Sequence, residues 1–374
     1  MIYLDSAATT LQKPPAVAAA MSAALKTMAS PGRGGHRPAT LAAETAYACR
    51  TQAARLFDVD QPEHVILTFN ATHGLNIAIK TLVKPQSTVL ISGYEHNAVT
   101  RTLAKLGAQV RTAQAPLFCP DELLQRFQEL LTDEVSAVIC THVSNVFGDI
   151  LPISGVAQLC RAWGVPLIVD ASQSAGCLPV SMEEWGAAFI AMPGHKGLYG
   201  PQGSGLLLCS GDAAETIMEG GTGSSSARQE MPELLPDRLE AGTHNIPGVA
   251  GLLEGLRFVE RRGAHEILAH ERALARRTAQ ALARMARVEV FAAPDLSGQA
   301  GVVSFRVDGM DCEAVGEVLG EQGIAVRAGL HCAPLAHSTA GTFETGTVRV
   351  SFSAFNQPWE IDRFLTRLER LIRR

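Results

Sequence analysis

The chain has 374 residues, of which 47% are hydrophobic and 18% charged, and its formal net charge is -5. This length accommodates a large hydrophobic core and favours two domains. No cluster of basic residues dominates, so we expect no nucleic-acid partner. No stretch reads as long and apolar enough for a bilayer, and the first residues do not resemble a secretion signal. We therefore expect a cytoplasmic protein without a membrane partner.

The eight cysteines form no metal-binding or disulfide pattern. They stand at positions 49, 119, 140, 160, 177, 209, 312 and 332, without a Cys-x-x-Cys pair or a regular spacing. This argues against a disulfide framework and a zinc site, and we expect no bound metal. Most have apolar neighbours and read as small hydrophobic residues. Cys332 differs, because Gly, His and Pro surround it.

In chain order, an arm of residues 1–15 precedes predicted helices at 15–28 and 40–56, and a glycine-rich loop with His36 separates these helices. Strand-like runs follow at 64–69, 88–92, 109–113, 137–141, 165–170, 187–192 and 206–209, with helices at 75–82 and 121–131 among them. Strands that alternate with helices predict a mostly parallel, helix-covered sheet. The fold class is therefore α/β, and such sheets bind ligands beyond the carboxyl ends of their strands.

The pattern changes near residue 250. A long helical stretch leads to strands at 288–291, 301–307 and 324–327 and a helix at 312–322, which is typical of a small α+β domain. We predict a large domain of residues 16–250 and a small C-terminal domain of residues 251–374. The arm, residues 1–15, is expected to pack with the small domain.

Two strand ends carry groups that suit one small molecule. Lys196 lies in a glycine-rich turn between two apolar runs, where burial would lower its pKa and make the amine a nucleophile toward carbonyls. The alternative interpretation of this segment is an ordinary surface lysine in a glycine-rich turn. Asp170 ends a buried strand nearby in the sequence. A Schiff base on a lysine with a carboxylate at the pyridinium nitrogen is how proteins hold pyridoxal phosphate.

A further strand end suits a phosphate. Thr72 and His73 follow the strand at 64–69 and precede a predicted helix at 75–82, so free backbone N–H groups would point at whatever lies above this turn. A simple helix N-cap by Asn70 or Thr72 is compatible with the same pattern.

Motifs spread over the whole chain, from Tyr3-Leu4-Asp5-Ser6-Ala7-Ala8-Thr9-Thr10 to Thr347-Val348-Arg349-Val350-Ser351, occur in the order of a known family. The sequence resembles class V of the fold-type-I pyridoxal-phosphate enzymes. Within that class it resembles the cysteine desulfurase and selenocysteine lyase family, and is closest to group II desulfurases. The resemblance implies a large domain with a mostly parallel, helix-covered sheet and a small α+β domain.

The resemblance also implies roles for residues at the strand ends. Lys196 would hold pyridoxal 5'-phosphate as a Schiff base, Asp170 would pair with its ring nitrogen, and His96 would stack on its ring. Asn145 and Gln173 would lie near the phenolic oxygen, Asn145 also near the substrate amine. The same cofactor pocket would include Thr72, His73 and His195. Thr243 would reach the phosphate of the neighbouring subunit's cofactor, so the resemblance implies a homodimer.

The sulfur chemistry is expected at Cys332. A protonated His331 or Arg327 beside it would favour the reactive thiolate. The segment resembles the Arg-x-Gly-x-His-Cys-Ala segment that bears the persulfide-forming cysteine of group II desulfurases; a buried structural thiol is the alternative. Two positions depart from the family: Leu330 replaces a second His, and Pro193 replaces a phosphate-binding Ser.

Arg349 lies in an apolar strand pattern, where a guanidinium needs an anionic partner. An internal carboxylate such as Glu344 could be that partner, but the resemblance implies the substrate's α-carboxylate. We assign His36 and Arg327 to the substrate side as well.

The resemblance implies conversion of L-cysteine to L-alanine with a persulfide on Cys332, His96 and Lys196 serving as catalytic residues. Three alternatives remain open: a selenocysteine lyase or another C–S lyase, a class V aminotransferase in which Cys332 is dispensable, and a non-catalytic sulfur carrier or scaffold. The expected partners are an amino-acid substrate and a protein that accepts the sulfur, which no segment identifies.

Overall fold

The computed structural model describes residues 1–31, 34–211, 213–295 and 297–373. Its centre is a seven-stranded sheet in the order β2-β8-β7-β6-β5-β3-β4, in which β8 runs antiparallel to both neighbours and the remaining pairs are parallel. The strands are β2 (Val65–Thr68), β3 (Thr88–Ser92), β4 (Gln109–Ala113), β5 (Val135–Thr141), β6 (Leu167–Asp170), β7 (Phe189–Pro193) and β8 (Gly205–Cys209). The predicted mostly parallel sheet is confirmed.

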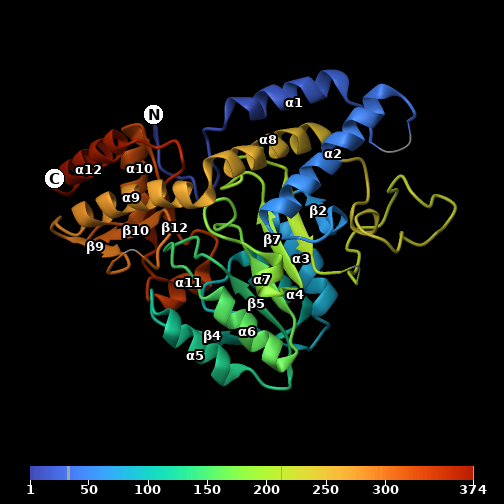
Figure 1. The fold of residues 1–374 in the computed structure, drawn as a ribbon. Helices are drawn as coiled ribbons and strands as arrows, with labels where there is room; N and C mark the ends of the chain where they lie inside the picture. The colour runs from blue at the N-terminus through green and yellow to red at the C-terminus, as the bar shows by residue number, and fades with distance from the viewer. Residues whose placement is uncertain (32–33, 212, 296, 374) are drawn as a thin grey trace.

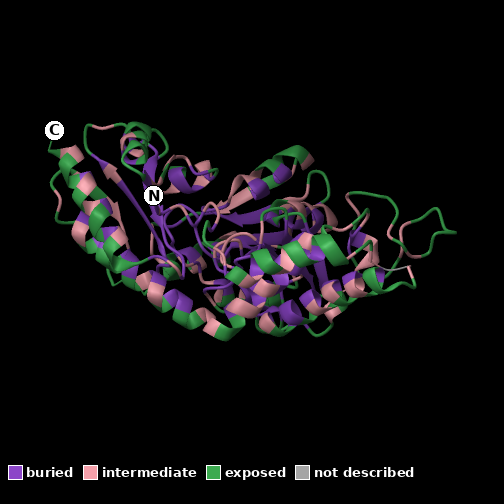
Figure 2. Cartoon of the chain, turned by 90° about the horizontal axis from the view of Figure 1, so that it is seen from above, coloured by how far each residue is buried: buried purple, intermediate pink, exposed green. Residues whose placement is uncertain are grey.

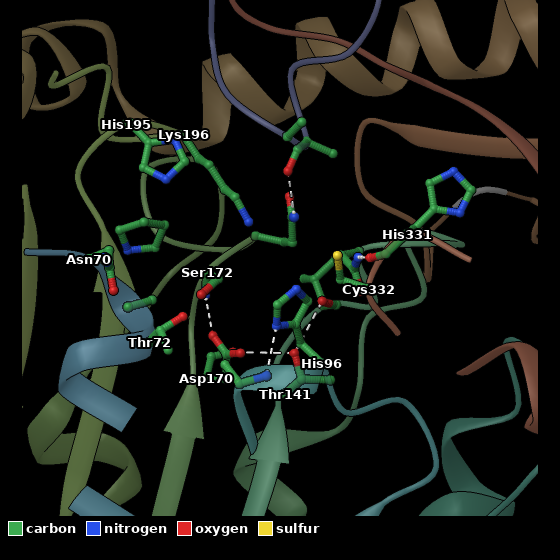
Figure 3. Close-up of a pocket in the computed structure, with 18 of the residues that line it drawn as sticks. Asn70, Thr72, His96, Thr141, Asp170, Ser172, His195, Lys196, His331 and Cys332 are labelled. Atoms are coloured by element: carbon green, nitrogen blue, oxygen red, sulfur yellow. Dashed lines mark hydrogen bonds between the residues drawn. The ribbon is translucent and has the colours of Figure 1, made fainter. Parts of the chain in front are cut away.

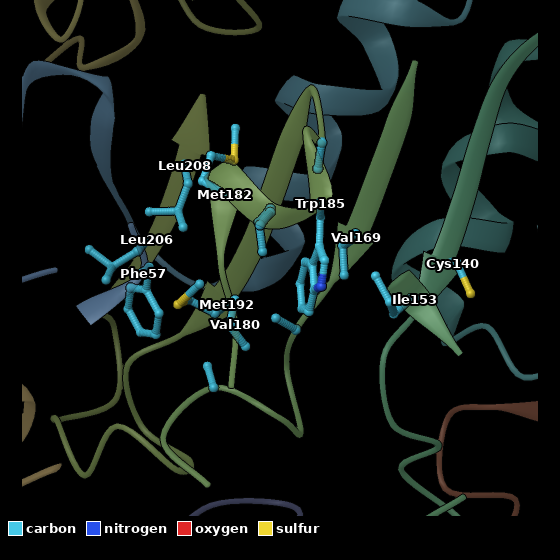
Figure 4. Packing of buried hydrophobic residues seen from close by; sticks show 14 of the residues in the cluster. Phe57, Cys140, Ile153, Val169, Val180, Met182, Trp185, Met192, Leu206 and Leu208 are labelled. Atoms are coloured by element: carbon cyan, nitrogen blue, oxygen red, sulfur yellow. The ribbon is translucent and has the colours of Figure 1, made fainter. Parts of the chain in front are cut away.

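Both faces of the middle of this sheet are covered, which explains why the strands β5 to β8 are almost continuous apolar runs. Successive residues of β5 point to opposite faces: Val138 and Cys140 belong to one apolar cluster, Ala137 and Ile139 to the other. Figure 4 shows part of the first cluster, and Figure 2 shows the buried strands between the outer helices. The helices of this region are α1 (Pro15–Thr27), α2 (Arg37–Leu56), α3 (Ala71–Leu82), α4 (Asn97–Leu106), α5 (Pro120–Leu130), α6 (Ile153–Trp163), α7 (Met182–Trp185) and α8 (Ile246–Arg262), with 3-10 turns η1 (Pro62–His64) and η2 (Asp237–Leu239).

The C-terminal part builds a second, antiparallel sheet in the order β12-β13-β10-β9. Its strands are β9 (Val288–Phe291), β10 (Val302–Val307), β12 (Arg327–Gly329) and β13 (Thr347–Ser351). The accompanying helices are α9 (Ala264–Leu282), α10 (Cys312–Glu321), α11 (Pro334–Thr339) and α12 (Pro358–Ile372). A separate apolar cluster, which includes Phe305, Val350 and Phe364, forms the core of this part.

The N-terminal arm contacts both the C-terminal part and the part that contains the large sheet (Figure 1). Strand β1 (Ile2–Tyr3) pairs in parallel with β11 (Ile324–Ala325), and Leu4 lies in the same cluster as Phe305. Further along, the threonines and the lysine of residues 9–13 contact the turn that carries Lys196. The arm therefore links the C-terminal part to the lysine turn.

Several bounds differ from the sequence predictions, and three of these differences concern contacts between elements. Helix α3 begins at Ala71 and not at residue 75, because Asn70 caps it by accepting a hydrogen bond from the His73 N–H. The expected strand 324–327 is two strands, since β11 pairs with the arm and β12 with β13. Helix α8 is continuous and packs on α1 and α2, so the predicted boundary at residue 250 falls inside a helix.

No helix in the described ranges combines the length and apolarity that crossing a membrane requires.

Candidate active site

A cavity of about 240 Å³ lies at the carboxyl ends of β5, β6 and β7, where the arm and the C-terminal part meet the large sheet (Figure 3). This is the edge at which parallel sheets bind ligands. The structure brings most of the predicted site residues together around it. Those that line the cavity are Thr72, His96, Asn145, Asp170, Gln173, His195, Lys196, Arg327, Cys332 and Arg349.

Lys196 extends from the turn after β7 toward the space above Asp170 (Figure 3). Desolvation by burial lowers the pKa of Lys196 to about 8, while the nearby Asp170 carboxylate opposes this change. Among the described residues its amine has no hydrogen-bond partner. An amine with this pKa is available as a nucleophile near neutral pH, as the sequence analysis anticipated.

The arm fixes the turn that carries Lys196. The carbonyl of His195 accepts hydrogen bonds from the Thr10 N–H at 3.1 Å and hydroxyl at 3.0 Å, and from the Lys13 amine at 2.9 Å. Burial and the charges of Lys196 and Lys13 lower the pKa of His195 to about 4, so its ring is neutral. Sequence reasoning missed Lys13, because nothing in residues 1–15 indicates contact with a turn so distant in the chain.

Asp170 ends β6 and is 3% exposed. The Ser172 N–H donates to its carboxylate at 2.9 Å. His96 caps α4 through Nδ1, which accepts from the Ala98 N–H at 3.0 Å. Burial lowers the pKa of His96, partly offset by Asp170. A neutral imidazole with Nδ1 as acceptor therefore faces the cavity beside a carboxylate.

Glu95, next to His96, is a second buried carboxyl group that was not assigned from the sequence. Its Oε1 accepts from the Ser92 hydroxyl at 2.6 Å and from the Thr141 N–H at 2.7 Å. Burial, reinforced by Asp170, raises the pKa of Glu95 to about 8. A protonated Glu95 therefore places no second negative charge beside Asp170.

The N-terminus of α3 supplies anion-binding groups. Asn70 uses the N–H of His73, which leaves the N–H groups of Ala71 and Thr72 without an acceptor inside the helix, and both residues line the cavity. Such groups, with the helix dipole, attract a phosphate. His73 does not line this cavity. Its ring stacks on Phe69 at 4.7 Å and contributes to a second hollow.

Arg349 lies on β13 and is 2% exposed. Its guanidinium donates to the Asn145 carbonyl at 2.8 Å and to Asp5 at 2.7 Å. The acidic neighbour of Arg349 is therefore Asp5 on the arm and not Glu344, which is exposed. The buried Nε of Arg349 has no partner among the described residues. The guanidinium has five N–H donors, so its bonds to Asn145 and Asp5 leave donor capacity for a second carboxylate.

Cys332 is exposed, whereas Cys119 is half-buried and the other six cysteines are buried. The alternative of a buried structural thiol is therefore wrong. His331 is 6% exposed, and its burial together with the charge of Arg349 lowers its pKa well below the usual range. His331 is therefore neutral near pH 7. Arg327 also lines the cavity, with about half of its side chain exposed.

Two other predicted residues lie outside the cavity. His36 is exposed and caps α2, accepting from the Ala39 N–H at 3.3 Å. Residues 32 and 33 of the same loop lie outside the described residues. Thr243 is exposed and lines the second hollow together with His73. Gln173 does line the cavity, but its side-chain amide donates to the Ala7 carbonyl at 2.9 Å.

The family model of the class-V aminotransferases matches residues 2–364. The chain belongs to this family. A Pyrococcus abyssi protein named probable cysteine desulfurase is 30% identical over 385 residues, which span 100% of this chain and 94% of the relative. A probable cysteine desulfurase of Mycolicibacterium paratuberculosis is 32% identical over 385 residues, and here the match spans 99% of this chain but 55% of the relative. The apo structure of a cysteine desulfurase from Thermococcus onnurineus NA1 superposes with a TM-score of 0.90 at 31% identity, covering 100% of this chain and 94% of that one. The predicted class V resemblance and fold are confirmed.

Class-V aminotransferases are pyridoxal-phosphate enzymes, and the cavity of this class-V chain fits that group. Two buried polar atoms that have no partner among the described residues, His195 Nδ1 and Arg349 Nε, belong to residues that line the cavity. Lys196 offers a desolvated amine, Asp170 a carboxylate, and the start of α3 two N–H groups. Pro193, at which the resemblance implied a phosphate-binding serine, also lines the cavity.

Proposed function

We propose that the chain is a pyridoxal-phosphate-dependent cysteine desulfurase that converts L-cysteine to L-alanine and leaves the sulfur as a persulfide on Cys332. The observation that carries the proposal is that one cavity combines the amine of Lys196, the buried guanidinium of Arg349 and an exposed thiol. An aminotransferase needs the first two groups but not the third. The names of the similar proteins from Pyrococcus and Thermococcus agree with this activity.

Lys196, Asp170 and the first turn of α3 would hold the aldehyde, the ring nitrogen and the phosphate of the cofactor. Bound there, pyridoxal phosphate would supply an electron sink for the electrons released at the substrate's α-carbon. Asp170 would keep the ring nitrogen protonated, and a protonated Glu95 places no second negative charge beside it. The neutral ring of His96 would supply a flat surface against the cofactor.

Lys196 is also the group that we assign to proton transfer at the substrate's α-carbon. Its pKa of about 8 allows the amine to take up and release a proton near neutral pH. The guanidinium of Arg349, which lines the cavity, would bind the substrate's α-carboxylate and so direct the side chain of the substrate.

The thiolate of Cys332 would then attack the substrate's sulfur atom. The new S–S bond forms as the C–S bond breaks, the electron pair of that bond stays on the carbon side, and a proton added there completes alanine. Arg327 and Cys332 line the same cavity.

The test compares the wild type with Cys332→Ala in the presence of L-cysteine, with alanine and sulfane sulfur both quantified. We expect both products from the wild type and neither from the variant. Undiminished alanine from Cys332→Ala would contradict the proposal and favour a C–S lyase, for which selenocysteine and cystine should then be assayed as substrates. Formation of 3-mercaptopyruvate with pyridoxamine phosphate would favour an aminotransferase.

We further propose a homodimer in which Thr243 completes the phosphate site of the neighbouring subunit. Its support is that Thr243 is exposed and lines a hollow outside the cavity of its own subunit. Co-expression of Lys196→Ala and Thr243→Ala subunits tests this, because only contribution across the interface restores one intact site per mixed dimer. Activity no higher than that of the two variants assayed separately would contradict it.

A protein that accepts the persulfide sulfur is the second proposed partner. We also propose a cytoplasmic location, which agrees with the eight cysteines being free thiols.

A further inference from the structure

The segment that carries Cys332 connects β12 and β13 of the small sheet, but it packs against the large domain. Ala333 and Ala336 belong to the same apolar cluster as Tyr94 and Phe147 of the large domain. The hydroxyl of Thr339, at the end of α11, donates to the Gly93 carbonyl at 2.8 Å. Residues 330–339 are thus docked against the loop that leads from β3 to α4.

The backbone at Cys332 has an unfavourable conformation. His331 and Cys332 are consecutive non-glycine residues with φ of 52° and 57°. Side chains at such values crowd the backbone, and the conformation persists only where the surroundings impose it.

Two hydrogen bonds from the large domain hold this turn. The side-chain amide of Asn145 donates to the His331 carbonyl at 2.7 Å, and the backbone N–H of Asn97 donates to the Cys332 carbonyl at 2.8 Å. Asn97 is the first residue of α4 and directly follows His96. Its N–H has no acceptor within the helix, because a helical N–H bonds to the carbonyl four residues earlier and that carbonyl lies before the helix begins. The same helix start therefore fixes His96 and the carbonyl of Cys332.

We propose that the backbone N–H of Asn97 is a positioning group for Cys332, which it holds at a fixed place relative to His96 and the cavity. The proposal deepens the proposed function and rests on it, since it assigns the nucleophile's geometry to α4. Asn145 makes the second bond, but it is also expected to contact substrate or cofactor, so its substitution would mix two effects.

The start of α4 permits a clean test. Asn97→Pro removes the N–H, and proline is well tolerated at the first position of a helix. His96 has φ of -74° and ψ of 156°, which is the region that a residue before proline prefers. Asn97→Ala is the matched control, because it removes the same side chain and keeps the N–H.

We expect the turnover number for alanine formation to be at least about tenfold lower in Asn97→Pro than in Asn97→Ala, with the KM for L-cysteine unchanged, because the nucleophile and not substrate binding is disturbed. Amide hydrogen exchange in residues 330–337 of the cofactor-free proteins is expected to be about fivefold faster in Asn97→Pro, since one hydrogen bond is lost. Equal turnover and equal exchange in the two variants would overturn the proposal.

Two further measurements keep the outcome decisive. If Asn97→Pro folds poorly, an ester in place of the amide at residue 97 removes the N–H without the proline ring, and the same results are expected of it. If Cys332→Ala forms alanine at the wild-type rate, the proposed function fails, whereas the exchange comparison still reports on the hydrogen bond itself.

Discussion

Replacement of Glu95 by glutamine tests the electrostatics beneath the active site. Glutamine retains an oxygen that can accept from the Ser92 hydroxyl and the Thr141 N–H, as Glu95 does at 2.6 and 2.7 Å. Its amide group takes the place of Oε2, which is buried without a partner in the described part of the chain. The substitution therefore removes the titration of this group while keeping its two hydrogen bonds.

The sign of the effect follows from the pKa of Glu95, which burial raises from 4.5 to about 8. Between these pH values the folded protein holds a proton that the unfolded chain has released. The stability contributed by the protonated group is thus fully present below pH 4.5 and is lost as the pH rises toward 8. At 1.4 kcal/mol per pH unit, the free energy of unfolding would fall by about 5 kcal/mol if the group stayed fully buried.

Urea unfolding at several pH values from 5 to 8 measures this loss. We expect the free energy of unfolding to fall less steeply with pH in Glu95→Gln than in the wild type, and the surface substitution Glu317→Gln to behave as the wild type. Glu271, whose pKa burial also raises to about 8, titrates in all three proteins, so its contribution cancels in the comparison. Equal pH dependence in the wild type and Glu95→Gln would refute a protonated Glu95.

Three further predictions concern the cavity directly. Arg349→Lys is expected to raise the KM for L-cysteine at least about tenfold, since an ammonium cannot reproduce the planar set of donors of a guanidinium. An unchanged KM in steady-state kinetics would show that Arg349 does not bind the substrate. Pro193→Ser is expected to lower the dissociation constant for pyridoxal phosphate, measured by fluorescence titration, because it restores a hydroxyl, and no gain in affinity would place the phosphate elsewhere. In the cofactor-free protein, the rate of reaction of Lys196 with pyridoxal phosphate is expected to rise with pH, with a midpoint near pH 8. Asp170→Asn should shift this midpoint to lower pH, because it removes the carboxylate that raises the pKa of Lys196. A midpoint above pH 10 in the wild type would contradict a desolvated Lys196.

The sequence predicted those parts of the fold that depend on local pattern. The strands at 88–92, 109–113 and 288–291 have the predicted bounds, because each is a short run between clear breaks. Lys196 and Asp170 could be placed together because both follow buried strands, and polar residues after parallel strands meet at one edge of the sheet.

Contacts between distant segments could not be predicted in this way. Asp5 and Arg349 pair across almost the whole chain, and no local pattern selects Asp5 over other carboxylates. The neutral state of His331 depends on its burial and on the charge of Arg349, which only the folded chain brings near it. Helix α3 starts earlier than predicted because the Asn70 cap outweighs the low helix propensity of the residues that follow.

The central claim is that Cys332 receives the sulfur of L-cysteine. Mass spectrometry of the holoenzyme after a single turnover, with alanine quantified in the same sample, tests it most directly. The account predicts one added sulfur atom on the peptide that contains Cys332 and one alanine formed per sulfur. Alanine without sulfur on Cys332, or sulfur on another cysteine, would contradict it.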